Sequence, residues 1–443
     1  MNRKWYRAFI AVFFLCCLIP SVGMLIFGAA PAAANELPMP KPALTDYNGH
    51  LDTAFFSDLQ NYVANGFFGR LQGITAWNRL SARVFDTSAN DDVLIGPDGW
   101  LFYGEAAREL SGAEQMTERE IWCAARSLYL MQEYTQSQGA DFLFAAVCGK
   151  YSLYPDHAPE YVTVAEGSDR EHLEAALAEQ GVNYVNLYDA FSQQDEILYW
   201  QWDSHWNSKG AALAADAILN AAGREGGYFA GPFTEEMNHR GDLYEMLYPT
   251  GKALETDYLW QPGFTFSYVT AFRSADDIII QTENPAGQGS LLMFRDSSGR
   301  SLYPYMAQSF EKAYFSRQNN QRIDYVNSQN ADLVVIEMAE RTLGYLLTYP
   351  AVFPSPVRED SVLDGTVTVM GEDVSLAAEA PGATMEGYVK VTGTLPDVTM
   401  AADSPIYVTV DGVVYEAIPG GESFTAWLPD RADWENARID ICI

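Results

Sequence analysis

The segment Asp141-Phe142-Leu143-Phe144-Ala145-Ala146-Val147-Cys148 is an almost uninterrupted apolar run, which predicts a strand buried on both faces of a sheet. The residues before this segment predict a helix. The helix begins at the capping box Thr117-x-x-Glu120, continues with apolar residues at helical spacing and ends at Gly139. A helix followed directly by a buried strand is one unit of an α/β fold.

The same order of elements returns further along the chain. A second helix is predicted from the capping box Ser168-x-x-Glu171 to Gly181, and a strand follows over 182–187. An alanine-rich stretch then predicts a third helix, with Ser208 as its cap. Repeated units of this kind predict an α/β fold with a parallel sheet covered by helices on both faces.

The pattern changes twice in the second half of the chain. Aromatic, alternating segments over 223–289 predict a β insertion, after which strands over 291–294 and 332–338 resume the α/β order. Beyond residue 353, short β runs and a clear hairpin turn at Asp411-Gly412 predict a small β-sandwich.

We therefore predict three parts: an N-terminal segment over 1–35, an α/β domain over 36–352 and a β-sandwich over 353–443. The β-sandwich is either a carbohydrate-binding module or a spacer.

The net charge limits the classes of binding partner, and the N-terminal segment indicates where the protein is located. The net charge of -32 argues against direct binding to nucleic acid, because like charges repel. Arg3, Lys4 and Arg7 precede an apolar run over 8–34, which predicts an export signal with the rest of the chain outside the cytoplasmic membrane. Ala32-Ala33-Ala34 is typical of a cleavage site, whereas the run is long enough for a signal anchor, so both outcomes stay open.

Acid–base chemistry is predicted in the stretch Tyr199-Trp200-Gln201-Trp202-Asp203-Ser204-His205-Trp206-Asn207-Ser208-Lys209-Gly210. Asp203 and His205 are two residues apart, so in an extended segment both side chains leave the same face and the carboxylate holds the imidazole. A serine nucleophile needs such a base. The best partner is Ser297, which follows the strand predicted over 291–294 at the edge where parallel sheets place their sites.

Simpler interpretations remain at this point. An Asp-x-His pair also occurs in ordinary hydrogen-bonded loops, and Asp296-Ser297 is typical of a helix N-cap. Asp and His also bind zinc, although His50, His157, His172 and His239 complete no ligand spacing.

Several segments together resemble one family. Gly96-x-Asp98-Gly99-Trp100-Leu101-Phe102-Tyr103, Asp203-x-His205-Trp206-Asn207, Gly241-Asp242-Leu243, Asp296-Ser297 and 332–337 occur in the order seen in the alginate O-acetyltransferase family, AlgX/AlgJ-like. The resemblance implies an exported SGNH-hydrolase-like domain that acetylates a cell-surface or secreted polysaccharide. It implies a membrane-bound O-acyltransferase as the source of the acetyl group and no diffusible cofactor.

The resemblance also implies roles for residues. Asp203, His205 and Ser297 match the family triad, and Tyr303 matches an active-site tyrosine. Lys150, Tyr154 and Pro155 resemble a family loop near the site.

We expect the Ser297 amide, with Tyr303 or Arg295, to stabilise the oxyanion and Asn207 to support the site. Arg295 and Ser298 stand where the family usually carries Gly and Phe, so Ser298 is a rival nucleophile. An acetyl esterase, a metal-dependent hydrolase and a non-catalytic glycan-binding protein are the alternatives.

Overall fold

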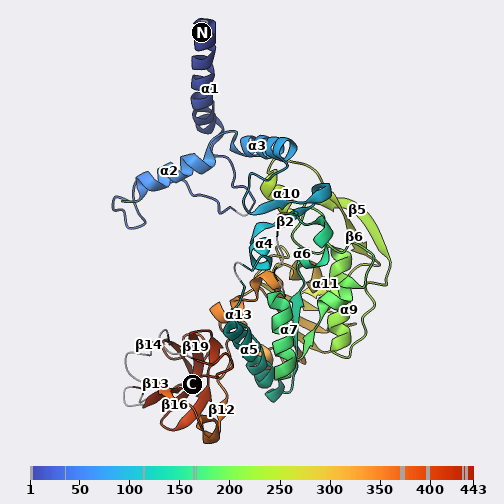
Figure 1. Cartoon of the computed structure of the whole chain (residues 1–443), viewed down its shortest axis with the longest axis vertical. Coiled ribbons are helices and arrows are strands. Elements are labelled where there is room, and N and C mark those ends of the chain that lie inside the picture. The colour runs from blue at the N-terminus through green and yellow to red at the C-terminus, as the bar shows by residue number, and fades with distance from the viewer. Residues whose placement is uncertain are drawn as a thin grey trace.

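The computed structural model describes residues 3–34, 36–112, 115–162, 165, 167–369, 375–395, 400–431, 434 and 438–443. Among these residues, a seven-stranded sheet forms the centre of the molecule, with the strand order β4-β3-β11-β9-β10-β8-β7 (Figure 1). Its strands are β4 (Tyr184–Val185), β3 (Asp141–Val147), β11 (Leu333–Ala339), β9 (Ser290–Phe294), β10 (Lys312–Ser316), β8 (Ile279–Glu283) and β7 (Ser267–Tyr268). The strands from β4 to β10 are parallel, which confirms the predicted fold class.

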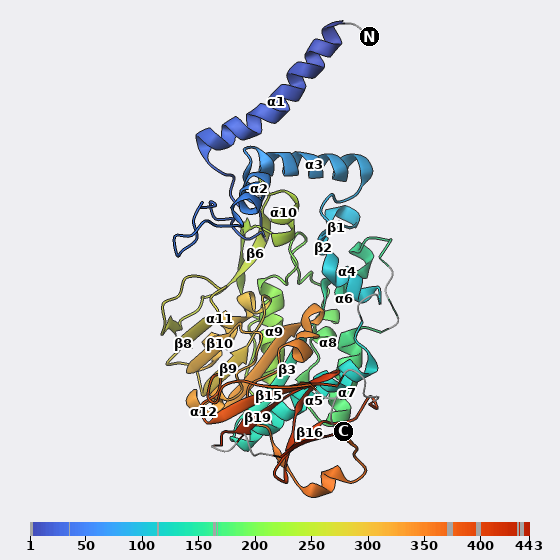
Figure 2. The ribbon, with the colours of Figure 1, turned by 90° about the vertical axis from the view of Figure 1, so that its left-hand side faces the viewer.

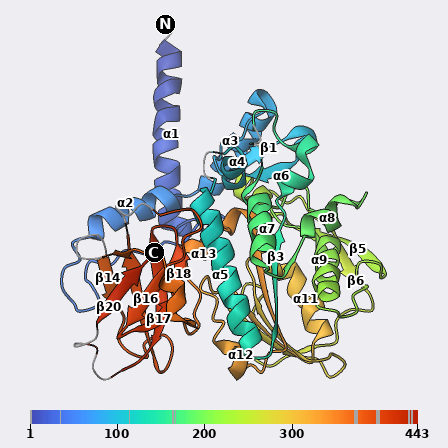
Figure 3. The same ribbon diagram turned by 60° about the horizontal axis from the view of Figure 1, so that its bottom comes forward.

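Helices cover both faces of this sheet. On β3, Phe142, Phe144 and Ala146 contribute to one apolar core, while the alternate residues contribute to the other. The first core is closed by α5 (Glu118–Ser137) and α7 (Asp169–Gln180), and the second by α8 (Leu187–Ser192), α9 (Ser208–Ala221) and α11 (Gly299–Ser309) (Figure 3). The apolar run of β3 is therefore explained by burial on both faces.

Local signals set the ends of most of these helices. Both predicted capping boxes are present, with Thr117 and Ser168 as the caps of α5 and α7. Two expectations were wrong in detail. The strand predicted over 182–187 shrinks to β4, because Asn186 already caps α8. Asn207, not Ser208, caps α9.

The β insertion is divided between two places. Strands β5 (Phe233–His239) and β6 (Glu255–Trp260) form an antiparallel pair of their own, with α10 (Asp242–Leu247) between them in sequence. Strands β7 and β8 instead extend the main sheet in the antiparallel sense. The turn after β5 lies beside the Asp203 loop, since Gly241 approaches the backbone of Trp202 so closely that a Cβ would lie 2.3 Å from its carbonyl oxygen.

The N-terminal region begins with α1 (Arg3–Phe27), which has the length and composition to cross a membrane, as a signal sequence also does. Asn35, beside the predicted cleavage site, lies outside the described residues. Two helices follow, α2 (Phe55–Gly66) and α3 (Arg70–Phe85), and then the hairpin of β1 (Val93–Ile95) and β2 (Leu101–Tyr103). The remaining short α-helices among the described residues are α4 (Gly104–Leu110), α6 (Lys150–Leu153), α12 (Tyr325–Ser328) and α13 (Tyr345–Thr348).

The described C-terminal residues form two antiparallel sheets. One contains β12 (Val357–Arg358), β17 (Val413–Glu416), β16 (Tyr407–Val410), β20 (Ile439–Cys442) and β13 (Thr368–Val369). The other contains β14 (Ser375–Ala378), β15 (Tyr388–Thr394), β19 (Ser423–Pro429) and β18 (Ile418–Gly420). The expected hairpin joins β16 to β17 through Asp411 and Gly412, both at positive φ.

The four-stranded C-terminal sheet packs against α5 as well as against its own partner sheet. Alternate residues of β19 divide between two cores: Phe424, Ala426 and Leu428 face the five-stranded sheet, while Trp427 joins the core of α5 and β3. The Trp427 Nε1 donates to the carbonyl of Ala351 at 2.9 Å. The two regions therefore share one core, and the predicted boundary between 352 and 353 stays a prediction.

An ion-pair cluster closes the same interface, and its loss is expected to loosen the C-terminal region. The Glu416 carboxylate is buried between Arg126 of α5 at 2.6 Å and Arg358 at 2.7 Å. We expect Glu416→Ala to leave two arginines without their shared partner and to destabilise this region by about 3 kcal/mol. Hydrogen exchange of β16 and β17 measures this loss.

The matched control is Glu379→Ala, which removes a more exposed carboxylate paired with Lys390 at 3.3 Å in the same region. We expect that variant to change the opening free energy of β16 and β17 by less than about 1 kcal/mol. Equal effects of the two substitutions would contradict the role given to the buried cluster.

Candidate active site

Ser297 lies on the turn after β9, at the carboxyl end of the parallel strands. The Asp296 carboxylate fixes this turn by accepting hydrogen bonds from the amides of Ser298 at 2.7 Å and Ala339 at 2.7 Å. The Asp296 amide in turn donates to Glu337 at 3.0 Å. Burial, together with the neighbouring Asp296 charge, raises the pKa of Glu337 well above its usual value. Asp296 therefore ties the nucleophile turn to the end of β11.

The Asp203–His205 stretch lies in a tight loop between α8 and α9, not in the extended segment that we expected. A single antiparallel bridge between Tyr199 and Trp206 closes the loop. The buried Lys150 side chain fixes this loop. Its ammonium group donates to the carbonyls of Leu101, Gln201 and Asp203 at 2.8, 2.9 and 2.9 Å. Burial lowers the pKa of Lys150 to about 7. Three acceptors match the three protons of an ammonium group.

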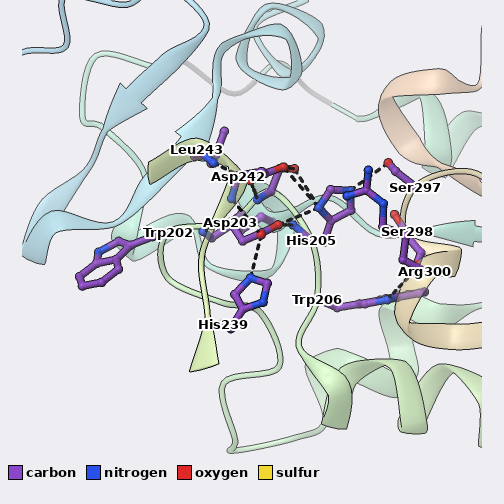
Figure 4. A network of polar contacts seen from close by, with 12 residues as sticks. Trp202, Asp203, His205, Trp206, His239, Asp242, Leu243, Ser297, Ser298 and Arg300 are labelled. Carbon is purple, nitrogen blue, oxygen red and sulfur yellow. Dashed lines mark hydrogen bonds and ion pairs between the residues drawn. The ribbon is translucent and has the colours of Figure 1, made fainter. Parts of the chain in front are cut away.

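The three predicted triad residues come together in one chain of contacts (Figure 4). The His205 Nδ1 lies 2.7 Å from Oδ1 of Asp203, and its Nε2 lies 2.9 Å from Oγ of Ser297. Ser298, the rival nucleophile, is buried, and its carbonyl accepts a hydrogen bond from Trp206 Nε1 at 3.0 Å. The geometry favours Ser297 as the partner of the imidazole.

Two further residues support this pair, and both come from the β insertion. His239, at the end of β5, places Nε2 2.8 Å from Oδ2 of Asp203 and stacks on Trp200 with ring centroids 3.5 Å apart. Asp242, at the start of α10, donates its amide to the same oxygen at 3.0 Å. Sequence reasoning missed these contacts, although Gly241-Asp242-Leu243 belongs to the segments that resemble the family and was an available signal.

The hydrogen bonds and charges around Asp203 and His205 shift the pKa values of both side chains. Burial alone would raise the pKa of Asp203, but hydrogen bonds from His205 and His239 outweigh it and hold this pKa well below its usual value. Burial lowers the pKa of His205, while hydrogen bonds to Asp203 and Asp242 reverse the effect and raise it to about 9. Because a general base acts in its neutral form, the rate is expected to rise with pH up to about this value.

Asp242 provides a direct test of this electrostatic arrangement. Its Oδ2 lies 3.4 Å from Nδ1 of His205 and accepts a hydrogen bond from the Ser204 hydroxyl at 2.6 Å. Asp242→Asn removes a negative charge that favours the imidazolium, so we expect the pKa of His205 to fall and the rising limb of kcat/KM against pH to move to lower pH. A pH profile with an activated acetyl ester measures the shift.

The control for this profile is Glu236→Gln, which removes an exposed charge from the same insertion. We expect its pH profile to match that of the unmodified chain. A limb that stays in place in Asp242→Asn, or that moves equally in both variants, would contradict this account.

The three residues expected to support the oxyanion make contacts elsewhere. The Asn207 side chain accepts from the Gly210 amide at 3.0 Å as the cap of α9. The Tyr303 hydroxyl bonds that of Tyr268 at 2.8 Å, within an aromatic cluster. Arg295 donates to the carbonyl of Ala275 at 2.7 Å. Arg295 also lines the cavity that contains Ser297, and a role of these three residues at the oxyanion stays a prediction.

Arg341 is the side-chain donor that sequence reasoning missed. It follows β11, and its Nη2 lies 3.4 Å from Oγ of Ser297. It lines a cavity of about 190 Å³ together with Ser297 and also a smaller one of about 40 Å³ that includes Ser298 and Tyr103. A guanidinium at this place is positioned to meet negative charge that develops beside the nucleophile.

Asp203, His205 and Asp242 are also close enough to one another to be ligands of one metal ion. Ligand atoms of Asp203, His205 and Asp242 all lie within 4.8 Å of one another. Both oxygens of Asp203 already accept hydrogen bonds, one from His205 and one from His239. The satisfied carboxylate favours an orienting role for Asp203 over a ligand role.

The sequence of this chain is similar to that of known proteins. Residues 93–286 match the family model described as SGNH hydrolase-like domain, acetyltransferase AlgX. Over these residues the chain is similar to the AlgX/AlgJ-like proteins. The predicted resemblance is thereby confirmed. The matched part of the AlgX/AlgJ-like region includes Asp203, His205, His239 and Asp242 and ends before Ser297.

Two curated relatives of the AlgX/AlgJ-like region are named probable alginate O-acetylase AlgJ. The protein from Pseudomonas aeruginosa is 25% identical over 259 residues, which cover 56% of this chain and 61% of the relative. The protein from Pseudomonas putida is 24% identical over 184 residues, which cover 40% and 46%. The chain thus spans less than two thirds of either relative. The O-acetyltransferase domain of Pseudomonas putida AlgJ aligns at 19% identity with a TM-score of 0.40, covering 57% of this chain and 92% of that structure.

Proposed function

We propose that this chain is an O-acetyltransferase that modifies a cell-surface or secreted polysaccharide outside the cytoplasmic membrane. One observation carries the proposal: Asp203, His205 and Ser297 form a continuous series of contacts of 2.7 and 2.9 Å at the carboxyl edge of the sheet. The two curated relatives named as probable O-acetylases support the reaction class.

In the first half of the reaction, the Ser297 oxygen attacks the carbonyl carbon of an acetyl donor while His205 Nε2 takes the hydroxyl proton. The tetrahedral intermediate carries its negative charge beside Arg341 and the amide of Ser297. The intermediate collapses, the bond to the donor group breaks, and His205 returns the proton to that group. The acetyl group is then an ester of Ser297.

In the second half, a sugar hydroxyl replaces the donor group. His205 takes the proton of the sugar hydroxyl while the sugar oxygen attacks the acetyl carbon. The bond between the acetyl carbon and the Ser297 oxygen then breaks, and His205 returns the proton to that oxygen. Asp203 keeps the imidazole in the required tautomer by accepting from Nδ1 in both halves.

The donor and acceptor complete the proposal. We infer that a membrane-bound O-acyltransferase delivers the acetyl group and that α1 either directs export of the chain or keeps it in the same membrane. The acceptor is a polysaccharide hydroxyl. A neutral or weakly charged glycan suits a chain with a net charge of -32 better than a strongly anionic one.

Intact-mass analysis after mixing with p-nitrophenyl acetate tests the proposal. We expect a burst of p-nitrophenol and one acetyl adduct in the unmodified chain, with neither in Ser297→Ala or His205→Ala. Ser298→Ala is the matched control and is expected to keep the adduct. Adduct formation that is equal in Ser297→Ala and the unmodified chain would refute the serine mechanism.

Two additions to this assay separate the alternatives. Release of the adduct that is accelerated by a polysaccharide supports transfer, whereas release only to water supports an esterase. A metal-dependent hydrolase loses its activity in EDTA, and we expect the burst to be unchanged there.

A further inference from the structure

Helix α3 has its polar side turned inward. Thr75, Asn78 and Ser81 recur at helical spacing and are all buried. The Asn78 amide donates to the carbonyl of Leu247 at 2.7 Å, and the Thr75 hydroxyl accepts from the Thr250 amide at 3.1 Å. The side of α3 that contacts the rest of the protein is therefore held by hydrogen bonds, not by an apolar core.

The outward side of α3 is apolar. Trp77, Leu80 and Val84 are spaced by three and four residues, so they form one stripe, and they are 57, 49 and 60% exposed. On α2, Phe56, Leu59 and Val63 repeat the same spacing and are also exposed. This distribution is the reverse of that on a helix at the surface of a water-soluble domain, and contiguous exposed apolar side chains mark a surface that something covers.

The position of α2 and α3 indicates what covers them. The loop between the two helices is fastened to the end of α1: Phe68 stacks on Phe27 with ring centroids 5.1 Å apart, and the Gly66 carbonyl accepts from the Ala30 amide at 2.8 Å. Figure 2 shows α3 crossing the direction of α1 at the end of that helix. With 25 residues, α1 is about 37 Å long, enough to cross the roughly 30 Å of hydrocarbon in a bilayer.

The charge of α3 agrees with this position. The whole chain has 59 acidic and 27 basic residues, yet α3 contains Arg70, Arg79 and Arg83 and no Asp or Glu. Arg79 and Arg83 directly precede Leu80 and Val84 in the stripe. An apolar stripe with a tryptophan and flanking arginines is typical of a helix that lies in the interface of an anionic bilayer.

We propose that α3 lies in the headgroup layer of the membrane that α1 enters, with Trp77, Leu80 and Val84 inserted toward the acyl chains. The contact is with lipid, and it holds the α/β domain in a fixed orientation on the outer surface of the membrane. The stripe and α1 together then set the distance between Ser297 and the bilayer, because the loop between α2 and α3 is fastened to the end of α1.

Spin labels on the full chain in lipid vesicles test this proposal. The native exposed cysteines are first removed by Cys16→Ser and Cys17→Ser, while the three other cysteines are buried. Labels are then placed singly by Leu80→Cys and Val84→Cys, with Val413→Cys as the control on an exposed strand of the C-terminal region. Vesicles of phosphatidylethanolamine and phosphatidylglycerol contain no other protein.

The readout is the ratio of collisions with oxygen, which concentrates in lipid, to collisions with a water-soluble nickel chelate. We expect this ratio to be several-fold higher at positions 80 and 84 than at 413. Equal ratios at the three positions would overturn the proposal. Labels that stay in water in these vesicles and become shielded only when a membrane protein is added would also overturn it, in favour of a protein partner. Acetylation of Ser297 is measured separately and does not enter this result.

Discussion

Asp203→Asn is expected to lower kcat for acetyl transfer by about four orders of magnitude. The carboxylate accepts from Nδ1 of His205 through one oxygen and from His239 and the Asp242 amide through the other. An asparagine keeps the shape of this group but presents an NH₂ in place of one acceptor. It also removes the charge that stabilises the imidazolium formed during the reaction. Single-turnover acetylation of Ser297, followed by intact mass, measures the loss.

His239→Gln is the companion variant, because glutamine retains a donor while Asp203 retains its charge. We expect a much smaller decrease in the acetylation rate than in Asp203→Asn. If Asp203→Asn keeps a rate within about tenfold of the unmodified chain, Asp203 is not the orienting acid. If instead both variants fall equally, the support from β5 is as important as the carboxylate itself.

Arg341→Ala is expected to lower kcat about a hundredfold while KM for the acetyl donor changes little. The guanidinium lies 3.4 Å from the Ser297 oxygen, so it is placed to stabilise the negative charge that develops only as the tetrahedral intermediate forms. Such an interaction stabilises the transition state more than the bound substrate. Arg341→Lys retains the charge but not the fork of donors and is expected to recover part of the rate.

Arg300→Ala serves as the matched control for Arg341. Arg300 is three residues beyond Ser297, and its Nε pairs with Asp276 at 2.6 Å, so it belongs to the surface near the nucleophile. We expect its kcat to stay close to that of the unmodified chain. An Arg341→Ala variant that raises KM and leaves kcat unchanged would assign Arg341 to substrate binding instead.

The fold was predictable from sequence where the signals are local. Capping boxes at Thr117 and Ser168 predicted the starts of two helices, and the apolar runs at 141–148 and 332–338 predicted two central strands, which the structure has at 141–147 and 333–339. The β insertion was recognised as β but could not be ordered, because its pairing joins residues far apart in sequence: β7 and β8 extend the main sheet while β5 and β6 stay apart. Strand pairing over such distances leaves no periodic trace.

In the site too, the residues with local signals were predictable, and those that arrive from distant segments were not. Asp203 and His205 are two residues apart in sequence, and Ser297 follows a strand whose end is recognisable. His239, Asp242 and Arg341 each reach the site from another element, and among them only Asp242 lies in a segment that resembles the family. Tyr303 and Arg295 are close to Ser297 in sequence, but the Tyr303 hydroxyl bonds that of Tyr268 and Arg295 donates to the carbonyl of Ala275.

In the four-stranded C-terminal sheet, the strands next to α5 are covered on both faces, whereas β14 at the edge is exposed. One face meets the five-stranded sheet and the other meets α5, near the point where Ser127 donates to the carbonyl of Pro419. The C-terminal region therefore shares its packing with the α/β region on the α5 side. A relative that dispensed with it would have to replace the apolar residues on that side of α5 by polar ones, and a shortened chain made in the laboratory would need the same repair.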